Sequence, residues 1–345
     1  MPNLNTIESS SMIETESYKT PTEKKILYIS WAESCSRSDQ TARELGGQSK
    51  MVYLAWLGSH PSTICFKYFG QALITAWHII RERPDVIFVM SPPLFAAFPA
   101  LLWKLIFGKP FVLDCHTGAF TNPRWKRFQW LQHFLCRQAA TNIVTNSHLE
   151  SLVETNGGKT TIVRDVPVLY ESTEPRFPFP AGFNVVAVCS FNYDEPIAAM
   201  FEAARQLSDV QFFFSGNPSR LDPEIAELRP ENVHLTGFLS DQQYGSLICN
   251  ADIVLTLTTQ DHTMLRGAWE AIYQATPVIV SDWPILQISF DKGAIHVDNS
   301  SDSIIQAIKF AQENIVGLRQ QAEEAKEDRL ERWQGVKEAL IEAVS

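Results

Sequence analysis

The sequence predicts an α/β fold of two doubly wound, Rossmann-like domains that face each other across a cleft. Three observations support this prediction. The chain has 345 residues, which suits two domains of ordinary size. Short apolar segments alternate with helix-like segments in both halves, as expected for parallel strands buried on both faces. The segment VPVLYESTEPRFPFPAG, residues 166–182, contains four prolines and separates the two series.

The first half of the chain contains short, largely apolar segments that predict strands. Helical spacing of apolar residues occurs in the segments 38–47 and 74–83. Strands separated by helices in this way form a parallel sheet that is covered on both faces. The predicted strands of this half are residues 25–30, 50–56, 85–90, 110–115 and 141–147.

The same alternation restarts after the proline-rich segment. Helices are predicted near 198–207, over 240–251 and over 266–275, and a Glu- and Lys-rich helix is predicted over 303–344 with a break near Gly317. Ligands of such sheets bind beyond the carboxyl ends of the strands, so we expect a site there. The predicted strands of this half are residues 184–190, 210–216, 232–238, 251–258 and 277–282.

The chain divides into five segments. The apolar run from Val86 to Trp103 approaches the length of a membrane span, but its prolines predict a strand, a turn and a short helix. The first 24 residues are polar and lack the apolar core of a signal peptide. We therefore expect a disordered tail (1–24), a first Rossmann-like domain (25–170), a proline-rich linker (171–182), a second Rossmann-like domain (183–320) and a C-terminal helix (321–345) that crosses back to the first domain.

Charge is unevenly distributed along the chain. The net charge of −10 argues against general binding of nucleic acid. Residues 25–150 hold 13 Lys and Arg against 7 Asp and Glu, a balance of +6, which leaves −16 for the rest. A basic first half favours an anionic partner on that half. The six scattered cysteines predict reduced thiols in a cytoplasmic protein, with no disulfide framework and no metal site.

A glutamate within an apolar helix marks the first candidate site. Glu270 has Trp269 and Ala271 as neighbours, and burying an unpartnered carboxylate costs several kcal/mol. The N-terminus of this helix, residues 263–267, offers free N–H groups to a phosphate, and Arg266 adds a bidentate donor. Glu270 lies far enough along the helix to accept the hydroxyls of a ribose. The alternative is an ordinary surface glutamate on an amphipathic helix.

The run HTMLRGAWEAIYQATPVIVSD, residues 262–282, resembles GT-B glycosyltransferases that use nucleotide-sugar donors. In this large family, similar to glycogen synthase and bacterial sugar transferases, the segment carries two glutamates eight residues apart. Glu270 matches the second, which the resemblance implies holds the donor ribose. His262 takes the place of the first, and Ala275 that of a glycine before the proline. PDVIFVMSPP, NIVTNSHLESL and LTGF have family-like placement in the rest of the chain.

The chain departs from this family after the first strand of its second domain. The family has an Arg and a Lys there that neutralise the diphosphate, whereas CSFNYDEP, residues 189–196, has no basic residue. In this respect, and in DCHTGAF (114–120), the chain resembles the β-mannosyltransferases that extend chitobiosyl-diphosphodolichol. Arg266 would then have to compensate for the missing cations. A donor domain that has lost its activity stays open as an alternative.

The resemblance and the strand ends together give the candidate site residues. His116 follows a strand and is expected to point into the cleft as a general base, with Asp114 orienting it or acting as the base itself. A structural histidine and a turn-capping aspartate are the alternatives. The expected donor-binding residues are Glu270, Arg266, Thr263, Met264, Leu265, His262, Ser190, Gly216, Asn217, Gly237, Phe238 and Leu239.

The acceptor is expected on the first domain. Arg37, near a helix N-terminus, is a candidate for an acceptor phosphate, and Trp125 and Arg127 belong to the basic and aromatic segment 123–138. Such a helix can lie on an anionic membrane surface, although an ordinary half-buried helix explains the same pattern.

These observations predict a metal-independent, cofactor-free glycosyltransferase. It would move a hexosyl group from a nucleotide-sugar donor to a lipid-linked or polysaccharide-precursor acceptor, in the cytoplasm or at the cytosolic membrane face. Two alternatives remain, a nucleotide-sugar epimerase of the same fold and an inactive binding subunit.

Overall fold

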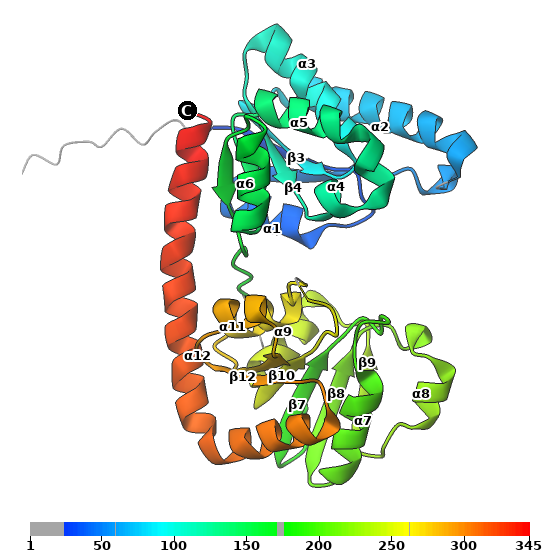
Figure 1. Ribbon diagram of the computed structural model, residues 1–345, viewed down its shortest axis with the longest axis vertical. Coiled ribbons are helices and arrows are strands. Elements are labelled where there is room, and N and C mark those ends of the chain that lie inside the picture. The colour runs from blue at the N-terminus through cyan, green and yellow to red at the C-terminus, as the bar shows by residue number, and fades with distance from the viewer. Residues whose placement is uncertain (1–23, 59, 171–175, 262) are drawn as a thin grey trace, which may run out of the picture.

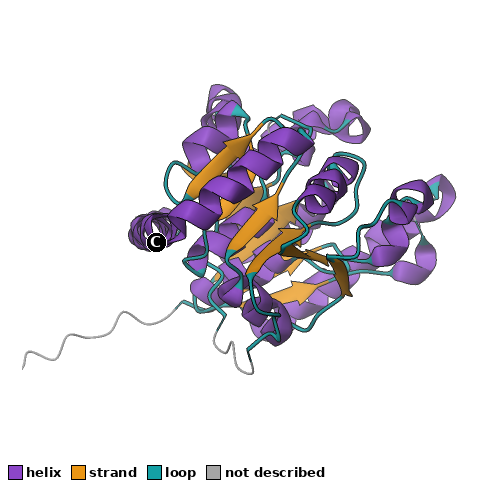
Figure 2. Cartoon of the chain, turned by 90° about the horizontal axis from the view of Figure 1, so that it is seen from below, coloured by secondary structure: helices purple, strands orange, loops and turns teal. Residues whose placement is uncertain are grey.

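The computed structural model describes residues 24–58, 60–170, 176–261 and 263–345. Over these residues the chain forms two α/β domains, which Figure 1 shows one above the other. Each domain has a parallel sheet of six strands, and helices cover both faces of the sheets (Figure 2). The predicted fold class is therefore confirmed.

The sheet of the first domain has the strand order β2-β1-β3-β4-β5-β6. Its strands are β1 (Ile26–Ser30), β2 (Gln48–Met51), β3 (Val86–Ser91), β4 (Phe111–Cys115), β5 (Asn142–Val144) and β6 (Thr160–Ile162). Its α-helices are α1 (Ser36–Glu44), α2 (Pro61–Glu82), α3 (Ala97–Phe107), α4 (Gly118–Thr121), α5 (Gln129–Gln138) and α6 (Ser147–Thr155). Short 3-10 turns cover Ala55–Leu57, Leu94–Ala96 and Pro123–Phe128.

The sheet of the second domain has the order β12-β11-β10-β7-β8-β9, so the direction of winding reverses between β7 and β10. Its strands are β7 (Phe183–Val188), β8 (Val210–Ser215), β9 (Val233–Gly237), β10 (Ile253–Thr256), β11 (Val278–Ser281) and β12 (Ala294–Val297). Its helices are α7 (Ile197–Gln206), α8 (Pro223–Glu227), α9 (Asp241–Asn250), α10 (Arg266–Tyr273), α11 (Pro284–Ser289) and α12 (Ser301–Ala343), with a 3-10 turn at Pro218–Arg220.

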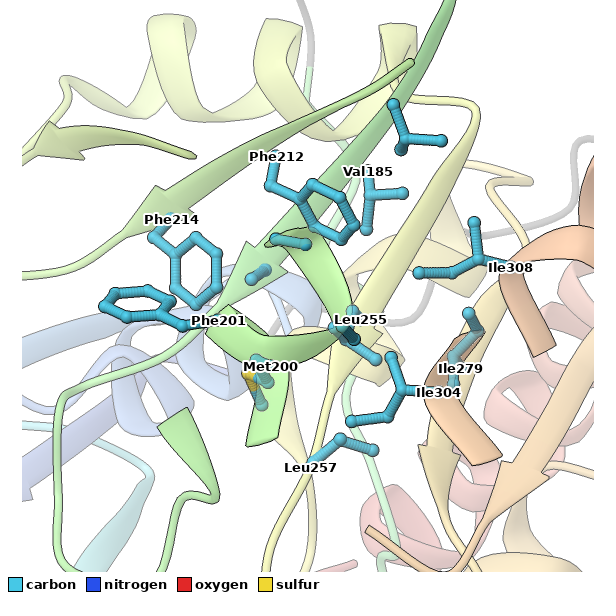
Figure 3. Packing of buried hydrophobic residues seen from close by; sticks show 14 of the residues in the cluster. Val185, Met200, Phe201, Phe212, Phe214, Leu255, Leu257, Ile279, Ile304 and Ile308 are labelled. Atoms are coloured by element: carbon cyan, nitrogen blue, oxygen red, sulfur yellow. The ribbon is translucent and has the colours of Figure 1, made fainter. Parts of the chain in front are cut away.

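The second sheet and the helices α7 and α12 enclose an apolar core (Figure 3). Phe214 of β8 packs edge-on against Phe201 of α7, with ring centroids 5.1 Å apart. Ile304 and Ile308, from the first turns of α12, close the core on the side of Val185. The core fixes the strand ends on which the candidate site is built.

The helix α12 connects the two domains. It begins beside the second domain and runs along the side of both to the first, where the C-terminus lies (Figure 1). Its Trp333 is buried in the first domain beside Tyr28, and Trp333 Nε1 donates to Glu44 Oε2 at 2.8 Å. The backbone leaves helical geometry at Asn314, within one turn of Gly317, near which we expected the break. The cause is visible, because the Asn314 amide donates to the carbonyl of Phe310 at 2.8 Å and so competes with the backbone bond of that turn.

Other differences from the predicted elements have physical reasons. The strand predicted over 50–56 is short, because β2 ends at Met51 and residues 55–57 form a 3-10 turn. The edge strands β6 and β12 were not predicted, because each is only three or four residues long and mostly half-exposed. Of the predicted tail and linker, residues 1–23 and 171–175 lie outside the described residues. Within the described ranges, no helix combines the length and apolar character that crossing a membrane requires.

Ala275, just past the end of α10, has a left-handed backbone conformation with φ of 58°. Its N–H donates to the carbonyl of Ile272 at 2.9 Å, and the N–H of Thr276 donates to that of Ala271 at 3.0 Å, the bond pattern of a Schellman motif. A residue with a Cβ costs about 1–2 kcal/mol in this conformation. We therefore expect Ala275→Gly to raise the free energy of unfolding, measured in urea, by about 0.5–1 kcal/mol once the extra chain entropy of glycine is included.

The matched control is Ala339→Gly at an exposed, regular position of α12. Here glycine should lower the free energy of unfolding by about 1 kcal/mol. Destabilisation of equal size by both substitutions would show that the left-handed conformation stores no strain at Ala275.

Candidate active site

A pocket of about 340 Å³ lies at the carboxyl ends of β7 and β10, where the winding of the second sheet reverses. Open α/β sheets bind their ligands at such a reversal. The pocket walls come from the loop after β7, the end of β10 and the start of α10. The lining residues are Val188, Cys189, Ser190, Asn192, Asp194, Glu195, Tyr244, Thr256, Leu257, Thr258, Thr263, Met264, Leu265, Arg266, Gly267 and Glu270.

Glu270 lines this pocket and is only 5% exposed, so it is not a solvated surface residue. Both oxygens of its carboxylate have partners. Arg266 Nε donates to Oε1 at 2.6 Å, and the hydroxyl of Tyr244 donates to Oε2 at 2.8 Å. Each carboxylate oxygen can accept more than one hydrogen bond, so Glu270 keeps capacity for the hydroxyls of a ligand. Arg266 itself is 54% exposed at the pocket mouth.

The first turn of α10 approaches the sheet closely at Gly267. A Cβ on Gly267 would lie 2.6 Å from Cγ1 of Val188 on β7 and 2.8 Å from Cγ2 of Thr256 on β10. Glycine is therefore what allows this helix to begin directly at the strand ends. Gly267 was not among the predicted site residues, although a glycine in the first turn of a helix that follows a strand is a recognisable signal.

The loop after β7 holds a carboxylate where the family pattern led us to look for cations. Glu195 accepts hydrogen bonds from the backbone N–H of Ser190 at 2.8 Å and from that of Asn192 at 3.1 Å. Burial raises the pKa of Glu195, and these N–H bonds oppose the rise. The loop therefore lacks the Arg and Lys of the family pattern. In their place it holds the Glu195 carboxylate, which accepts hydrogen bonds from the N–H groups of the loop. We did not predict this role for Glu195.

A second acidic residue ties this loop to the end of β10. The hydroxyl of Thr258 donates to Asp194 Oδ2 at 2.9 Å, and the N–H of Thr259 donates to the Asp194 carbonyl at 2.7 Å. The buried hydroxyl of Thr256, on the pocket wall, has no hydrogen-bond partner among the described residues. A ligand in the pocket could supply one.

The structure brings only part of the predicted donor-binding set together. Ser190, Thr263, Met264 and Leu265 line the pocket with Glu270 and Arg266. His262 lies outside the described residues. The remaining residues lie at the end of β9 or directly after β8 and β9, at the same edge of the sheet but outside the pocket walls given above. They are Gly216, Asn217, Gly237, Phe238 and Leu239.

Gly216 has a structural reason for being glycine. It has a φ of 113°, and a Cβ there would lie 2.3 Å from the carbonyl oxygen of Cys189. Phe238 is 83% exposed beyond the end of β9, where its ring is free to contact a ligand that extends past the pocket. Neither residue touches the pocket that holds Glu270.

The predicted catalytic residues of the first domain form a connected group at the end of β4. Asp114 is fully buried, and its Oδ2 accepts hydrogen bonds from the Tyr28 hydroxyl at 2.5 Å and from Arg37 Nε at 3.3 Å. His116 Nε2 lies 3.4 Å from the same oxygen. The His116 ring is 34% exposed, while its Nε2 is buried beside Asp114, in a charge contact that lacks hydrogen-bond geometry. Nδ1 is therefore the nitrogen that is left for a substrate.

Asp114 is held in its charged form. Burial alone would raise the pKa of Asp114, but the Arg37 guanidinium, the His116 ring and the hydrogen bond from Tyr28 hold it well below its usual range. A carboxylate this stable is a poor proton acceptor. Of the two roles that we considered for Asp114, orientation of His116 fits this geometry and action as the base does not.

The residues predicted to bind the acceptor have different surroundings from those we expected. Arg37 is used within the fold, because it donates to Asp114 and, through Nη2, to the carbonyl of Val163 at 3.1 Å. Trp125 is buried in the core of the first domain. Arg127 is exposed on the same 3-10 turn.

The two candidate sites approach each other at a pocket between the domains. Arg37, Gln40 and Asp165 line this pocket of about 160 Å³ on one side, and Arg266 and Glu270 line it on the other. Arg37 therefore touches both the buried Asp114 and the space that faces Glu270. The arrangement can hold a ligand in the second domain with one end directed at the first.

Two family models match the chain. The model "Glycosyl transferase 4-like domain" matches residues 35–168, and the model "Glycosyl transferase-like" matches residues 196–337. The two matched ranges cover the two domains seen in the structure. No curated protein matches the sequence of the chain.

Solved structures resemble the whole molecule. HepE of Anabaena in complex with UDP has a TM-score of 0.64 at 14% identity, over 92% of this chain and 98% of that one. Sucrose-phosphate synthase from Thermosynechococcus elongatus has a TM-score of 0.61 at 13% identity, over the same two shares. A putative UDP-N-acetylglucosamine 2-epimerase from Listeria monocytogenes has a TM-score of 0.58 at 15% identity, over 87% and 91%. This likeness establishes the GT-B fold; the expected likeness to β-mannosyltransferases stays a prediction.

Proposed function

The chain belongs to the group 1, glycosyl transferase 4-like family of GT-B glycosyltransferases, and from this membership we propose that it moves a hexosyl group from a nucleotide-diphosphate-sugar donor to a lipid-linked or polysaccharide-precursor acceptor. The observation that carries the proposal is the buried Glu270 in the pocket at the sheet reversal. HepE of Anabaena has been solved with UDP and with UDP-glucose, which supports a donor of this class.

The donor diphosphate is placed at the start of α10 in this proposal. The positive end of the α10 dipole and the exposed fork of Arg266 attract negative charge there, and Glu270 accepts the ribose hydroxyls one turn further on. Glu195 already occupies the amides of the opposite loop, so Arg266 is the cation on which the departing diphosphate depends. The proposed step uses no metal ion.

The acceptor half supplies the base. Nδ1 of His116 takes the proton of the acceptor hydroxyl as the sugar is transferred, and Asp114 positions the ring through the buried Nε2. The positive charge balance of this half attracts the phosphate of a lipid-linked acceptor and an anionic membrane surface on the cytosolic side.

Two alternatives make different use of the same fold. A nucleotide-sugar epimerase would act on free donor and would not need an acceptor. An inactive binding subunit is suggested by the acidic loop 189–196 and would bind donor without consuming it. Release of UDP that depends on added acceptor identifies the transferase. Conversion of the donor sugar to its epimer without acceptor identifies the epimerase, whereas the binding subunit leaves the donor unchanged.

Substitution of Glu270 tests the donor site. We expect Glu270→Ala to weaken the binding of UDP-glucose, the first probe, by about 1.5–3 kcal/mol, because a hydrogen bond to a charged group is lost. Isothermal calorimetry measures the change in Kd directly. If UDP-glucose does not bind, the same measurement is made with the GDP-, ADP- and dTDP-sugars.

The matched control is Glu338→Ala, which removes an exposed glutamate of α12 far from the pocket. Its donor affinity should equal that of the unsubstituted protein. An unchanged Kd in a folded Glu270→Ala protein would contradict the ribose-binding role.

A further inference from the structure

The first domain presents a continuous apolar face to solvent on α2 and α3. The apolar residues of α2 on this face recur every three or four positions, and all are more than half exposed. Those of α3 are also more than half exposed. We call this surface the α2–α3 face, and it is formed by Phe66, Phe69, Leu73, Trp77 and Ile80 of α2 and Leu102, Leu105, Ile106 and Phe107 of α3.

The two helices pack against each other at the end of the first domain that is remote from the second (Figure 1). Between them lies an apolar groove of about 780 Å³, which is lined by Ile80, Leu102, Ile106 and Phe107 among others. Soluble monomers rarely expose an apolar patch this continuous. The face is therefore built to be covered by an apolar partner.

The charges around the face select the kind of partner. The sequence has no Asp or Glu from residue 61 to 81 or from 86 to 113, which includes all of α3. The acids between these stretches are neutralised, because Glu82 lies 3.0 Å from Lys25 and Asp85 lies 2.6 Å from Lys109. Arg81 lies over the ring of Trp77, 5.1 Å from its centroid. An apolar face with only cations left unbalanced at its rim is complementary to anionic lipid.

A second apolar groove adjoins this face. It has a volume of about 470 Å³ and is lined by Phe69 of α2, Phe98 of α3 and Trp31. Trp31 directly follows β1, so it lies at the edge of the first sheet that bears His116. Arg124 lines the groove as well. The face is thus continuous with a path that an apolar chain could follow to the reaction site.

We propose that the α2–α3 face docks on an anionic lipid bilayer, with its apolar side chains among the lipid chains and its rim of Arg and Lys on the headgroups. This location differs from the segment 123–138 that the sequence suggested, where Trp125 and Leu135 are buried and Trp130 is exposed. The inference rests on the proposed function in one respect only, that a lipid-linked acceptor gives the docking a purpose.

The test measures flotation of the full chain with vesicles of phosphatidylcholine alone and of phosphatidylcholine mixed with an equal amount of phosphatidylglycerol. We expect binding to the anionic vesicles that weakens as salt is added, because salt screens the headgroup charge. The double substitution Leu73→Glu/Leu105→Glu should lower the bound fraction by roughly tenfold or more, since two carboxylates would have to enter the lipid interface. Both positions are exposed, so the fold should persist, and an unchanged melting curve checks this.

Two single variants locate the surface. Phe310→Glu on α12 replaces a side chain that is also about half exposed, and it should bind vesicles like the unsubstituted protein. Trp130→Glu tests the segment 123–138. If Trp130→Glu abolishes binding and the double variant does not, the proposal is overturned in favour of that segment.

Two further outcomes would also overturn the proposal. One is the absence of vesicle binding by the unsubstituted protein. The other is a concentration-dependent dimer, seen by light scattering, that the double variant dissociates, because the face would then join two copies of the chain. Vesicle binding is measured without donor, so it can be interpreted even if the donor-binding test fails. Conversely, a failed flotation test does not contradict the glycosyltransferase proposal.

Discussion

The substitution His116→Ala is expected to lower turnover by about 10²- to 10⁴-fold, the range that a positioned general base supplies. The ring lies at the carboxyl end of β4, where it is one-third exposed with Nε2 buried against Asp114. Alanine removes the only group in this cluster that combines an exposed edge with a titratable nitrogen. The rate is measured as release of the nucleoside diphosphate in the presence of acceptor, at saturating donor.

The readout must separate a lost base from a disturbed fold. Donor affinity should stay within about twofold, because the ring does not line the pocket of Glu270. His234→Gln is the control, since it removes an exposed imidazole on β9 that stacks on Phe213 and contacts Gln211, outside the pocket of Glu270. Loss of turnover with unchanged donor affinity supports the base. Full turnover in His116→Ala would show that His116 is a structural histidine.

Much of the fold could be predicted because buried parallel strands leave a clear sequence signal. Runs such as VIFVM and VVAV are apolar throughout, and only a strand covered on both faces needs that. The edge strands β6 and β12 gave no such signal, since one of their faces is solvated. The kink in α12 was placed at a glycine by propensity, whereas the side-chain amide of Asn314 produces it.

The candidate site was predictable where one residue contradicted its surroundings. Glu270 stands out as a charge within an apolar helix, and it is buried and paired as that conflict suggests. Glu195 gave no comparable signal, and Arg37 was selected for an acceptor phosphate and not for its contact with Asp114. Both roles depend on the amides and the carboxylate that folding brings beside these residues, and no spacing along the chain encodes those contacts.

The α2–α3 face was missed for a related reason. Hydrophobic periodicity shows that a helix has an apolar stripe, but it does not show which side the protein core covers. The stripe on α2 therefore has the same appearance in the sequence as one that packs inward. The lack of acidic residues over 61–81 and 86–113 was the available signal, and the charge balance of the whole half reflects it only weakly.

The second large effect is expected at Asp114. We expect Asp114→Asn to lower the free energy of unfolding by up to about 3–5 kcal/mol at neutral pH, because it leaves the part-buried Arg37 guanidinium without its buried counter-charge. The asparagine keeps the size of the side chain, so the loss reports charge and not packing. Urea unfolding of both proteins gives the difference.

A surface ion pair provides the matched control for this change. Asp85 lies 2.6 Å from Lys109 Nζ, which is closer than Asp114 lies to Arg37. However, the side chains of Asp85 and Lys109 are each about two-fifths exposed. Solvent screens such a contact, and Asp85→Asn should cost at most about 1 kcal/mol. If the two substitutions cost the same, burial does not amplify the Asp114–Arg37 contact.

The pH dependence of the difference identifies the charge of Asp114 as its cause. The pKa of Asp114 is held well below its usual range in the folded protein, whereas in the unfolded chain it returns to about 3.9. A carboxyl group with a depressed pKa contributes stability that is fully present above about pH 5 and is lost as the pH falls toward its folded value. The difference in free energy of unfolding between the unsubstituted protein and Asp114→Asn should therefore be constant from neutral pH down to about pH 5. This difference should decrease steadily below about pH 4. Protonation makes aspartic acid as neutral as asparagine, so both proteins then leave Arg37 equally unpaired. A difference that stays constant down to pH 3 would mean that the asparagine is destabilising through its geometry, and that the charge of Asp114 is not what holds Arg37 and His116 in place.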